Sequence, residues 1–319
     1  MQAYIIRRII LFIPVLFIFS IVLFFLLRVM PGDVVGLYLG LEEDSPPLAK
    51  EEADRIRAQL GFDRPVIVQY GEWLGGIFRG DLGRSLGAGR DVSQVVKDKF
   101  PVTFELGVMS LLIAYILSIP SGIFMAIRQD TIADYVTRVL TLISLAMPTF
   151  WVGILIIIIL SRQFNWLPPL AYVQFMDDPL TNLNQMFWPA VATGTASMAF
   201  ASRITRSSML EVLRQDYIRT AAAKGLAYRT QILRHALRNA LIPVVTLFGL
   251  AVTNIASGSV IMETLFGLPG LGQEFLRAIN QRDYPLVQGI AVVLAGWVLA
   301  VNLLVDLLYP FIDPRVKYS

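Results

Sequence analysis

Hydrophobic positions along the chain gather into long uncharged runs. The first run covers residues 9–27 and holds no charged residue over nineteen positions, which is enough to cross a bilayer as a helix. A cleavable signal peptide is the alternative, but the run is too long for the apolar core of a signal peptide. The "RVMPGD" that follows it is also not a small-x-small cleavage site. We therefore expect an uncleaved first span.

Five further runs predict five more membrane-spanning helices. The fourth, about residues 186–202, is short for a span and contains Pro189. Pro120, Pro148 and Pro189 are expected to kink spans two, three and four, because proline removes a helical hydrogen bond. The charged residues that bracket the other four runs are, in order, Lys99 and Arg128, Arg138 and Arg162, Arg238 and Glu263, and Asp283 and Asp306.

Lysine and arginine in the short loops predict the orientation of these spans. Residues 203–238, after span four, hold eight Lys/Arg and two acidic residues, whereas the loops after spans three and five are poorer in net positive charge. Basic loops face the cytoplasm, so six spans with both termini in the cytoplasm satisfy the alternation. Residues 31–99 then lie outside, because long loops cross the membrane regardless of their charge.

The predicted division of the chain has three parts. Residues 1–30 form the first span, 31–99 a helical extracytoplasmic segment, and 100–319 a core with five spans that includes the loop 203–238. In the extracytoplasmic segment a helix is expected between Ser45, as its cap, and Gly61, just past its end. A second helix follows, and its apolar face can lie on the membrane or another subunit, or on this chain's own spans. That face comprises Ile67, Tyr70, Trp73, Leu74, Ile77 and Phe78.

Composition supports a membrane protein and narrows its chemistry. The 319 residues are 55% hydrophobic and only 16% charged, too few charges for a soluble chain of this length. There is no cysteine and a single histidine, His235, so neither disulfides nor a cysteine- or histidine-ligated metal is expected. The net charge of +3 is modest, and we expect no nucleic-acid partner.

The loop 203–238 contains a predicted helical hairpin. Asp216 is expected to cap its first helix, where a carboxylate meets free amides, and Gly225 to take the left-handed position after the end of that helix. A second amphipathic helix follows. An ordinary basic loop that binds anionic lipid is the alternative, but two capped helices around a glycine are typical of a docking surface. The apolar positions expected to share a face in the first helix are Ile218, Ala221, Ala222 and Leu226.

The hairpin resembles the cytoplasmic loop of ABC importer permeases of the dipeptide/oligopeptide/nickel class. The match to the general permease motif is poor, since Arg219-Thr220-Ala221 stands in place of Glu-Ala-Ala, but the peptide-class version fits "DYIRTAAAKG" and "HALRNA" closely. The resemblance covers the whole chain, with Val34 where proline is usual. Its other motifs are "RVMPGDVV", "RGDLGRS", "RITRSSMLEVL", "ETLFGLPGLGQ", "QRDYPLVQG" and "NLLVDLLYPFIDPRVKY".

The resemblance implies an all-α, type I ABC importer permease fold in a bacterial or archaeal plasma membrane. It implies a heterodimer with a second permease, two ATPase subunits that bind ATP and Mg, and an extracytoplasmic substrate-binding protein. The first hairpin helix would couple to an ATPase, while this chain would hold no cofactor and catalyse no reaction. The sequence has no phosphate-binding loop of its own. The coupling residues carried over are Asp216, Tyr217, Arg219, Thr220, Ala221, Ala222, Lys224 and Gly225.

Polar residues of span five are candidates for the translocation path, because polar groups in spans usually face protein or water. They are Asn254, Ser257 and Ser259, with Glu263 at the outer end. Hydrogen bonding between helices is the alternative for each. The "GLPGLG" turn that follows could form a re-entrant loop over the mouth of the path, or a plain surface turn. Its candidate gate residues are Gly267, Pro269, Gly270 and Gly272.

Two other functions compete with a permease subunit. A stand-alone secondary transporter would need coupling-ion ligands near the midplane and usually an internal repeat, and neither is evident. An intramembrane enzyme would need a catalytic motif such as HExxH or a pair of aspartates within the spans, and none is present. Transport by the purified chain alone would distinguish the secondary transporter from the permease.

Overall fold

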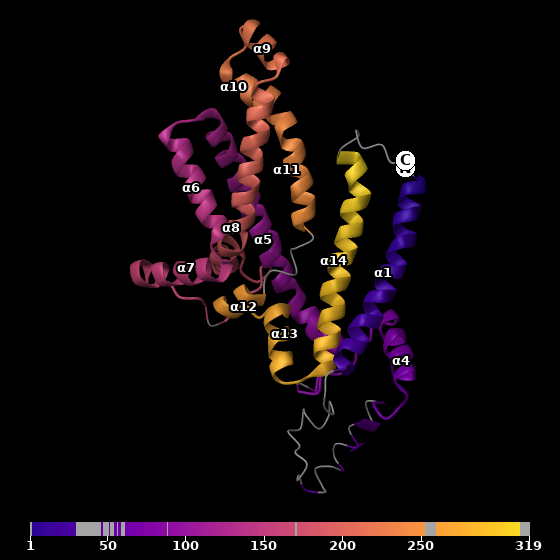
Figure 1. The fold of residues 1–319 in the computed structure, drawn as a ribbon. Coiled ribbons are helices and arrows are strands. Elements are labelled where there is room, and N and C mark those ends of the chain that lie inside the picture. The colour runs from indigo at the N-terminus through magenta and orange to yellow at the C-terminus, as the bar shows by residue number, and fades with distance from the viewer. Residues whose placement is uncertain are drawn as a thin grey trace. The chain divides into compact units, whose positions relative to one another are not determined.

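In a computed structural model, the chain is a set of helices. The structure describes residues 2–29, 46, 51, 54, 55, 57, 58, 61–87, 89–169, 171–252 and 260–312. Within these ranges the non-helical pairing is a single isolated bridge between Arg84 and Asp91. The helices belong to two compact units, which are described separately (Figure 1). The all-α expectation is confirmed for the described part of the chain.

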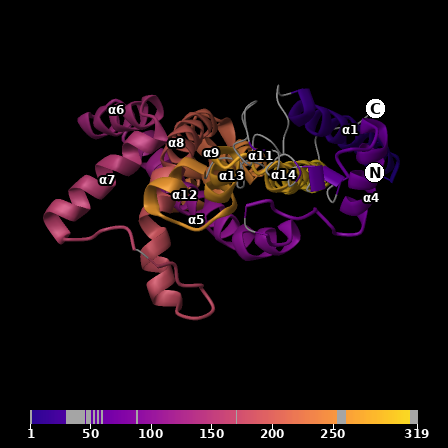
Figure 2. The same cartoon turned by 90° about the horizontal axis from the view of Figure 1, so that it is seen from below.

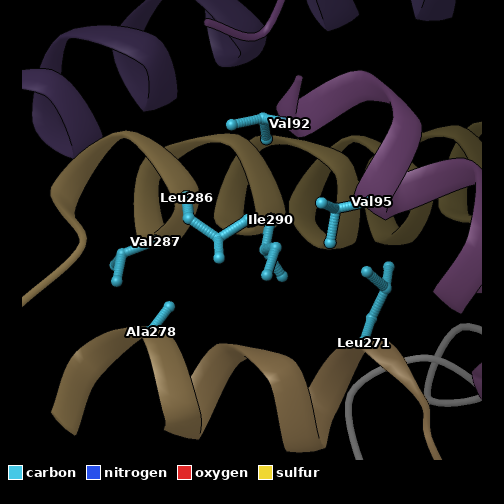
Figure 3. Packing of buried hydrophobic residues seen from close by; sticks show 7 residues of the cluster. All are labelled: Val92, Val95, Leu271, Ala278, Leu286, Val287 and Ile290. Carbon is cyan, nitrogen blue, oxygen red and sulfur yellow. The ribbon is translucent and has the colours of Figure 1, made fainter. Parts of the chain in front are cut away.

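Unit 1 comprises Met1–Val102 and Pro269–Ala300. It contains α1 (Gln2–Val29), α4 (Val66–Phe78), the start of α5 (Val92–Ile127), α13 (Leu271–Asn280) and most of α14 (Tyr284–Ile312). Its core joins α5, α13 and α14 (Figure 3). Gly289 is needed there, because a Cβ at this position would lie 2.4 Å from Cγ1 of Val92. The core residues are Val92, Val95, Leu271, Ala278, Leu286, Val287 and Ile290.

Helix α4, in the 31–99 segment, packs partly on α1. Phe24 of α1 is fully buried beside the rings of Tyr70 and Trp73, at centroid distances of 5.2 and 5.3 Å. The Tyr70 hydroxyl also lies 2.8 Å from Oγ of Ser20. Ile67 and Phe78 of the same predicted apolar face are instead 77% and 84% exposed. Packing on the chain's own first helix therefore accounts for only the middle of that face.

Two of the motifs meet in unit 1 at a buried carboxylate. Asp283, fully buried, accepts hydrogen bonds from Oγ of Ser85 at 2.5 Å and from the amide of Gly87 at 2.9 Å. It also accepts from the amide of Leu286 at 3.2 Å, within the first turn of α14. The "RGDLGRS" and "QRDYPLVQG" segments are thus held together by one side chain, because a buried carboxylate must have its acceptor sites filled.

Unit 2 comprises Thr103–Leu268 and Val301–Ser319. It contains the rest of α5, then α6 (Ile132–Ala146), α7 (Thr149–Phe164), α8 (Pro179–Leu213), α9 (Asp216–Ala223), α10 (Tyr228–Thr230), the π-helix η1 (Gln231–Ala236), α11 (Leu237–Val252) and α12 (Val260–Phe266). Small residues bring α5 and α8 close together. A Cβ on Gly122 would lie 2.4 Å from Cβ of Thr205, and one on Gly194 would lie 2.6 Å from the carbonyl oxygen of Ser110.

Three helices are long and apolar enough to cross a membrane: Val92–Ile127, Tyr228–Val252 and Tyr284–Val305. They correspond to predicted spans two, five and six. The pair α6 and α7 would add a fourth, although it is bent by 110° at Met147–Pro148 (Figures 1 and 2). This bend confirms the expected break at Pro148, which precedes the first residue of α7. These helices support a multi-pass membrane protein. The number of six spans stays a prediction, because these candidate spans come from the described residues alone.

Candidate functional site

The predicted hairpin is present, and Gly225 ends its first helix. Gly225 has φ +79, the left-handed conformation that glycine adopts without cost. Its amide donates to the carbonyl of Ala222 at 2.9 Å, and the amide of Leu226 donates to the carbonyl of Ala221 at 3.3 Å. This pair of bonds is a Schellman motif. The turn satisfies the free carbonyls of α9 and sends the chain into the second helix.

The start of α9 differs from the expectation. Asp216 is the first residue of the helix, and Gln215 holds the cap position without a side-chain hydrogen bond. The prediction that Asp216 caps the helix was therefore wrong by one residue. Its carboxylate pairs instead with Arg219 one turn later, at 3.2 Å, and both side chains are exposed. An acid in the first turn still favours the helix through its dipole.

The two sides of α9 have different environments. Ile218 and Ala221 face inward and are 5% and 8% exposed. Ile218 belongs to a cluster with residues of α5, α8, η1 and α11. All predicted coupling residues except Ala221 face outward. Ala222 is one of them, so the buried apolar face of α9 is narrower than predicted. The exposed set is Asp216, Tyr217, Arg219, Thr220, Ala222, Lys224 and Gly225.

The second half of the hairpin connects this surface to span five. Ile232 and Ala236 of η1 are buried in the same cluster as Ile218. The helix η1 continues directly into α11. Asn239 at the start of α11 donates from Nδ2 to the hydroxyl of Tyr217 at 2.7 Å. A π-helix widens the backbone by one residue per turn and often marks a functional site. The first helix is thus held on the base of α11 by packing and by one exposed hydrogen bond.

The predicted path residues are only partly described. Asn254, Ser257 and Ser259 lie outside the described residues. Glu263, in α12, is fully buried, and its Oε1 accepts from Oγ1 of Thr103 at 2.7 Å. The structure therefore gives Glu263 the bond between helices that the sequence left open as an alternative.

Three of the four candidate gate residues lie between α12 and α13, and the fourth lies inside α13. Gly267 ends α12 with φ +69, and the amide of Leu268 donates to the carbonyl of Glu263 at 2.8 Å. In unit 1, Pro269 is followed by Gly270, which caps α13 in an extended conformation. Gly272 lies in the first turn of α13 and is buried. The expected turn is present, but Gly272 belongs to the helix after it.

The described residues include no group of three or more His, Asp or Glu side chains placed to hold a metal ion. The arrangement instead offers a helix, α9, that has one exposed face and is fixed to the base of a span. Such a surface is suited to docking a protein and passing its movement inward.

Similarity to known proteins shows the family of this chain. Residues 118–318 match the family described as binding-protein-dependent transport system inner membrane component. Residues 1–107 match the family's N-terminal component. The chain belongs to this permease family. The resemblance found in the motifs of the sequence is thereby confirmed, and the chain is a permease subunit of an ABC importer.

Relatives of this permease match over its entire length. A putative peptide transport system permease protein of Brucella abortus is 40% identical over 319 residues, with both chains covered completely. An oligopeptide transport system permease protein of Bacillus subtilis and a dipeptide transport system permease protein of Escherichia coli are each 38% identical, again over the whole of both chains.

An ion cluster between α6 and α8 of this permease was not predicted from the sequence. Asp134 of α6 is fully buried and accepts from Nε and Nη2 of Arg206 in α8, at 3.0 and 2.9 Å. Nη2 of Arg138 lies 3.3 Å from the same carboxylate. The sequence offered only a weak signal, an acid beside arginines at the edge of a predicted span, because the main partners are 72 positions apart.

A second polar network joins the loop after α7 to α5 and α8. The Tyr172 hydroxyl donates to Oε2 of Glu105 at 2.7 Å and accepts from Nδ2 of Asn182 at 3.2 Å. Burial raises the pKa of Tyr172, and the bond to Glu105 raises it further. Gln185 fixes the same loop through the backbone of Ala171 and Val173. Glu105 therefore helps to order this loop.

Proposed function

We propose that this permease subunit forms half of a path that imports peptides or related small solutes. The names of its relatives from three organisms, all peptide, oligopeptide or dipeptide permeases, support this substrate class. The other half of the path would come from a second, related permease. ATP and Mg would bind to two separate ATPase subunits, and a substrate-binding protein would deliver the solute from outside.

In this proposal α9 is the helix that sits in a cleft of one ATPase. The observation that carries it is the two-sided hairpin, with an outward face of Tyr217, Arg219 and Lys224 and an inward face of Ile218 and Ala221. An ATPase that grips the outward face would move the inward face with it. The Schellman turn at Gly225 keeps the helix from unwinding when it is pulled.

Movement of α9 would reach the membrane through η1 and α11. Ile218 packs with Ile232 and Ala236, so a displacement of α9 presses directly on the π-helix. The bond from Asn239 to Tyr217 adds a second connection at the base of α11. Because packed side chains transmit strain with little compression, α11 is the span that we expect to respond first.

The proposed topology has six spans, with both termini and the hairpin in the cytoplasm and residues 31–99 outside. The distribution of Lys and Arg supports it. Asn254, Ser257 and Ser259 then belong to the middle or outer half of span five, where they are proposed to line the path. The turn at Gly267 and Pro269 would lie on the outer side, where the binding protein delivers its cargo.

Reconstitution tests the proposed function against a stand-alone transporter. The chain is placed in proteoliposomes alone, with the second permease, and with both ATPases added, and uptake of a labelled dipeptide is measured. We expect uptake only in the complete complex supplied with ATP, Mg and loaded binding protein. Uptake by the chain alone, driven by an ion gradient, would refute the proposal that separate ATPase subunits drive transport.

Cysteine labelling tests the topology separately. The native chain has no cysteine, so Ser45→Cys and Thr230→Cys each introduce a single reactive site. An impermeant thiol reagent added to intact cells should label position 45 and should label position 230 only after the membrane is opened. The reverse pattern would place the hairpin outside.

A further inference from the structure

A cavity of about 410 Å³ lies between α6 and α8, within unit 2. None of its lining residues belongs to α9, η1 or α11. Its volume falls in the range of small-molecule sites. Three arginines and two hydroxyl residues line it, together with apolar side chains. The lining residues are Arg138, Thr141, Leu142, Phe200, Arg203, Ile204, Arg206 and Ser207.

Positive charge is in excess at this cavity. Arg206 is committed to Asp134, which accepts two hydrogen bonds from it. Arg138 shares the same carboxylate at 3.3 Å. Arg203 is exposed and makes no ion pair within the part of the chain that the structure describes. The cavity and its adjoining ion cluster thus hold three guanidinium groups and one carboxylate, a net charge of +2.

Donors at the cavity are also left without acceptors. Nε and Nη2 of Arg138 are buried and have no hydrogen-bond partner, because the contact to Asp134 is close but not aligned. The guanidinium is held in place by the ring of Tyr135, whose centroid lies 4.4 Å from Cζ. A buried charged donor without an acceptor is costly. Nε and Nη2 are closed to solvent, but 34% of the Arg138 side chain is exposed, and this part lines the cavity, where it can meet an oxyanion.

The apolar part of the cavity indicates what carries this anion. Leu142 and Phe200 line it and are 52% and 47% exposed. Along α6 the exposed apolar surface continues through Val139 and Ile143. A water-soluble phosphate would gain nothing from this surface, whereas an acyl chain would bury it. Cations at one end of a cavity and exposed apolar side chains at the other match a phospholipid.

We propose that this cavity binds an anionic phospholipid, with its headgroup phosphate on Arg138 and Arg203 and an acyl chain along Leu142 and Phe200. Basic pockets between membrane helices bind anionic headgroups in this way. The inference rests on the proposed topology, which puts the α5–α6 loop and Arg138 near the cytoplasmic surface of the membrane. Occupancy would offset the excess positive charge at the cavity and steady the junction of α6 with α8, the helix that leads into the hairpin.

The test measures lipid binding by the full chain in nanodiscs. Wild type and variants are placed in phosphatidylcholine with increasing phosphatidylglycerol, and retained phosphatidylglycerol is counted by native mass spectrometry. Arg203→Gln should weaken its retention about fivefold, the effect of one arginine near a lipid phosphate. Arg138→Gln should weaken it at least as much. Arg128→Gln is the matched control, since Arg128 is exposed, lies in the turn before α6 and does not line the cavity.

Three results would overturn the proposal. Equal loss in Arg128→Gln and Arg203→Gln would mean that general surface charge attracts the lipid. Inorganic phosphate that displaces phosphatidylglycerol at equal concentration would mean that the cavity takes a free anion. Weaker retention of the ATPase in pure phosphatidylcholine, with lipid binding unchanged in Arg203→Gln, would mean that an acidic protein segment is the ligand.

Failure of this inference is distinguishable from failure of the proposed function. Lipid counting needs no transport and no partner subunit. A wild-type complex that imports a dipeptide but retains no phosphatidylglycerol would refute only the lipid site. A chain that retains the lipid through Arg203 but requires no ATPase for uptake would refute only the proposed coupling.

Discussion

Two regions of unit 2 that are rich in arginine place these side chains in opposite environments. In the hairpin, the cations face outward, and the pair of Asp216 with Arg219 has side chains that are 94% and 74% exposed. At the α6–α8 junction, Arg206 and Arg138 converge on Asp134, whose side chain is fully buried. Basic residues thus form an exposed surface in one place and an ion cluster around a buried carboxylate in the other.

The difference shows that a count of Lys and Arg does not tell whether their side chains are exposed or paired with a buried acid. Exposed ion pairs contribute little to stability and are weakened by salt. A buried carboxylate with two arginines cannot be exchanged with water, so removing one member leaves an uncompensated charge. The exposed charges of the hairpin can therefore leave their pairs and bind another protein, whereas Asp134 must keep its arginine partners.

The largest expected effect is at the junction. Asp134→Asn leaves Arg206 and Arg138 without a counter-charge and should destabilise the protein by about 3 kcal/mol. The matched control is Asp216→Asn, which removes the exposed partner of Arg219 and should change stability little. Thermal unfolding of the detergent-solubilised chain measures both. Similar small shifts in the two variants would remove the distinction between the regions.

The next effect concerns the backbone of the hairpin. Gly225→Val forces a β-branched residue into φ +79, at a cost of about 1–2 kcal/mol or more. We expect the complex to assemble weakly, or to hydrolyse ATP without uptake.

The matched control for this variant is Gly225→Asn, because asparagine tolerates the left-handed conformation. A Cβ at position 225 meets no atom within 4 Å, so steric clash cannot explain a difference between the two. Normal ATPase affinity and uptake in Gly225→Val would exclude α9 as the coupling helix.

The smallest effect is expected at the exposed bond between α9 and α11. Tyr217→Phe removes the hydroxyl that accepts from Asn239, and such bonds contribute about 1 kcal/mol or less at exposed positions. Assembly should be unchanged, while uptake per ATP hydrolysed should fall by about twofold. Tyr228→Phe, at a second exposed tyrosine of the hairpin, should leave the ratio intact. Equal ratios in both variants would show that packing alone transmits the movement.

Much of the hairpin could be predicted from the sequence because its determinants are local. The helix, the turn at Gly225 and the inward position of Ile218 follow from residues within one or two helical turns of one another. The break before α7 was equally predictable, since Pro148 cannot continue a helix hydrogen-bonded to the residues before it. The cap was misplaced by one residue because an acid is favourable both at a cap and in the first turn.

The π-helix and the narrower apolar face of α9 could not be predicted in the same way. Helical periodicity describes Gln231–Ala236 equally well as an α-helix or as the wider helix that the structure contains. Ala222 is small and apolar, so only the packing of neighbouring helices decides that it is exposed while Ala221 is buried.

The sequence by itself determined that this chain is a helical membrane protein with a basic hairpin, because long apolar runs, loop charge and turn residues act over short distances, and its motifs carried the resemblance to a permease family. Only the tertiary structure decided which polar groups are buried together. Asp134 meets Arg206 across 72 positions, Glu263 meets Thr103 across 160, and Asp283 meets Ser85 across 198. Each carboxylate needs a partner because it is buried, and burial depends on how the helices pack.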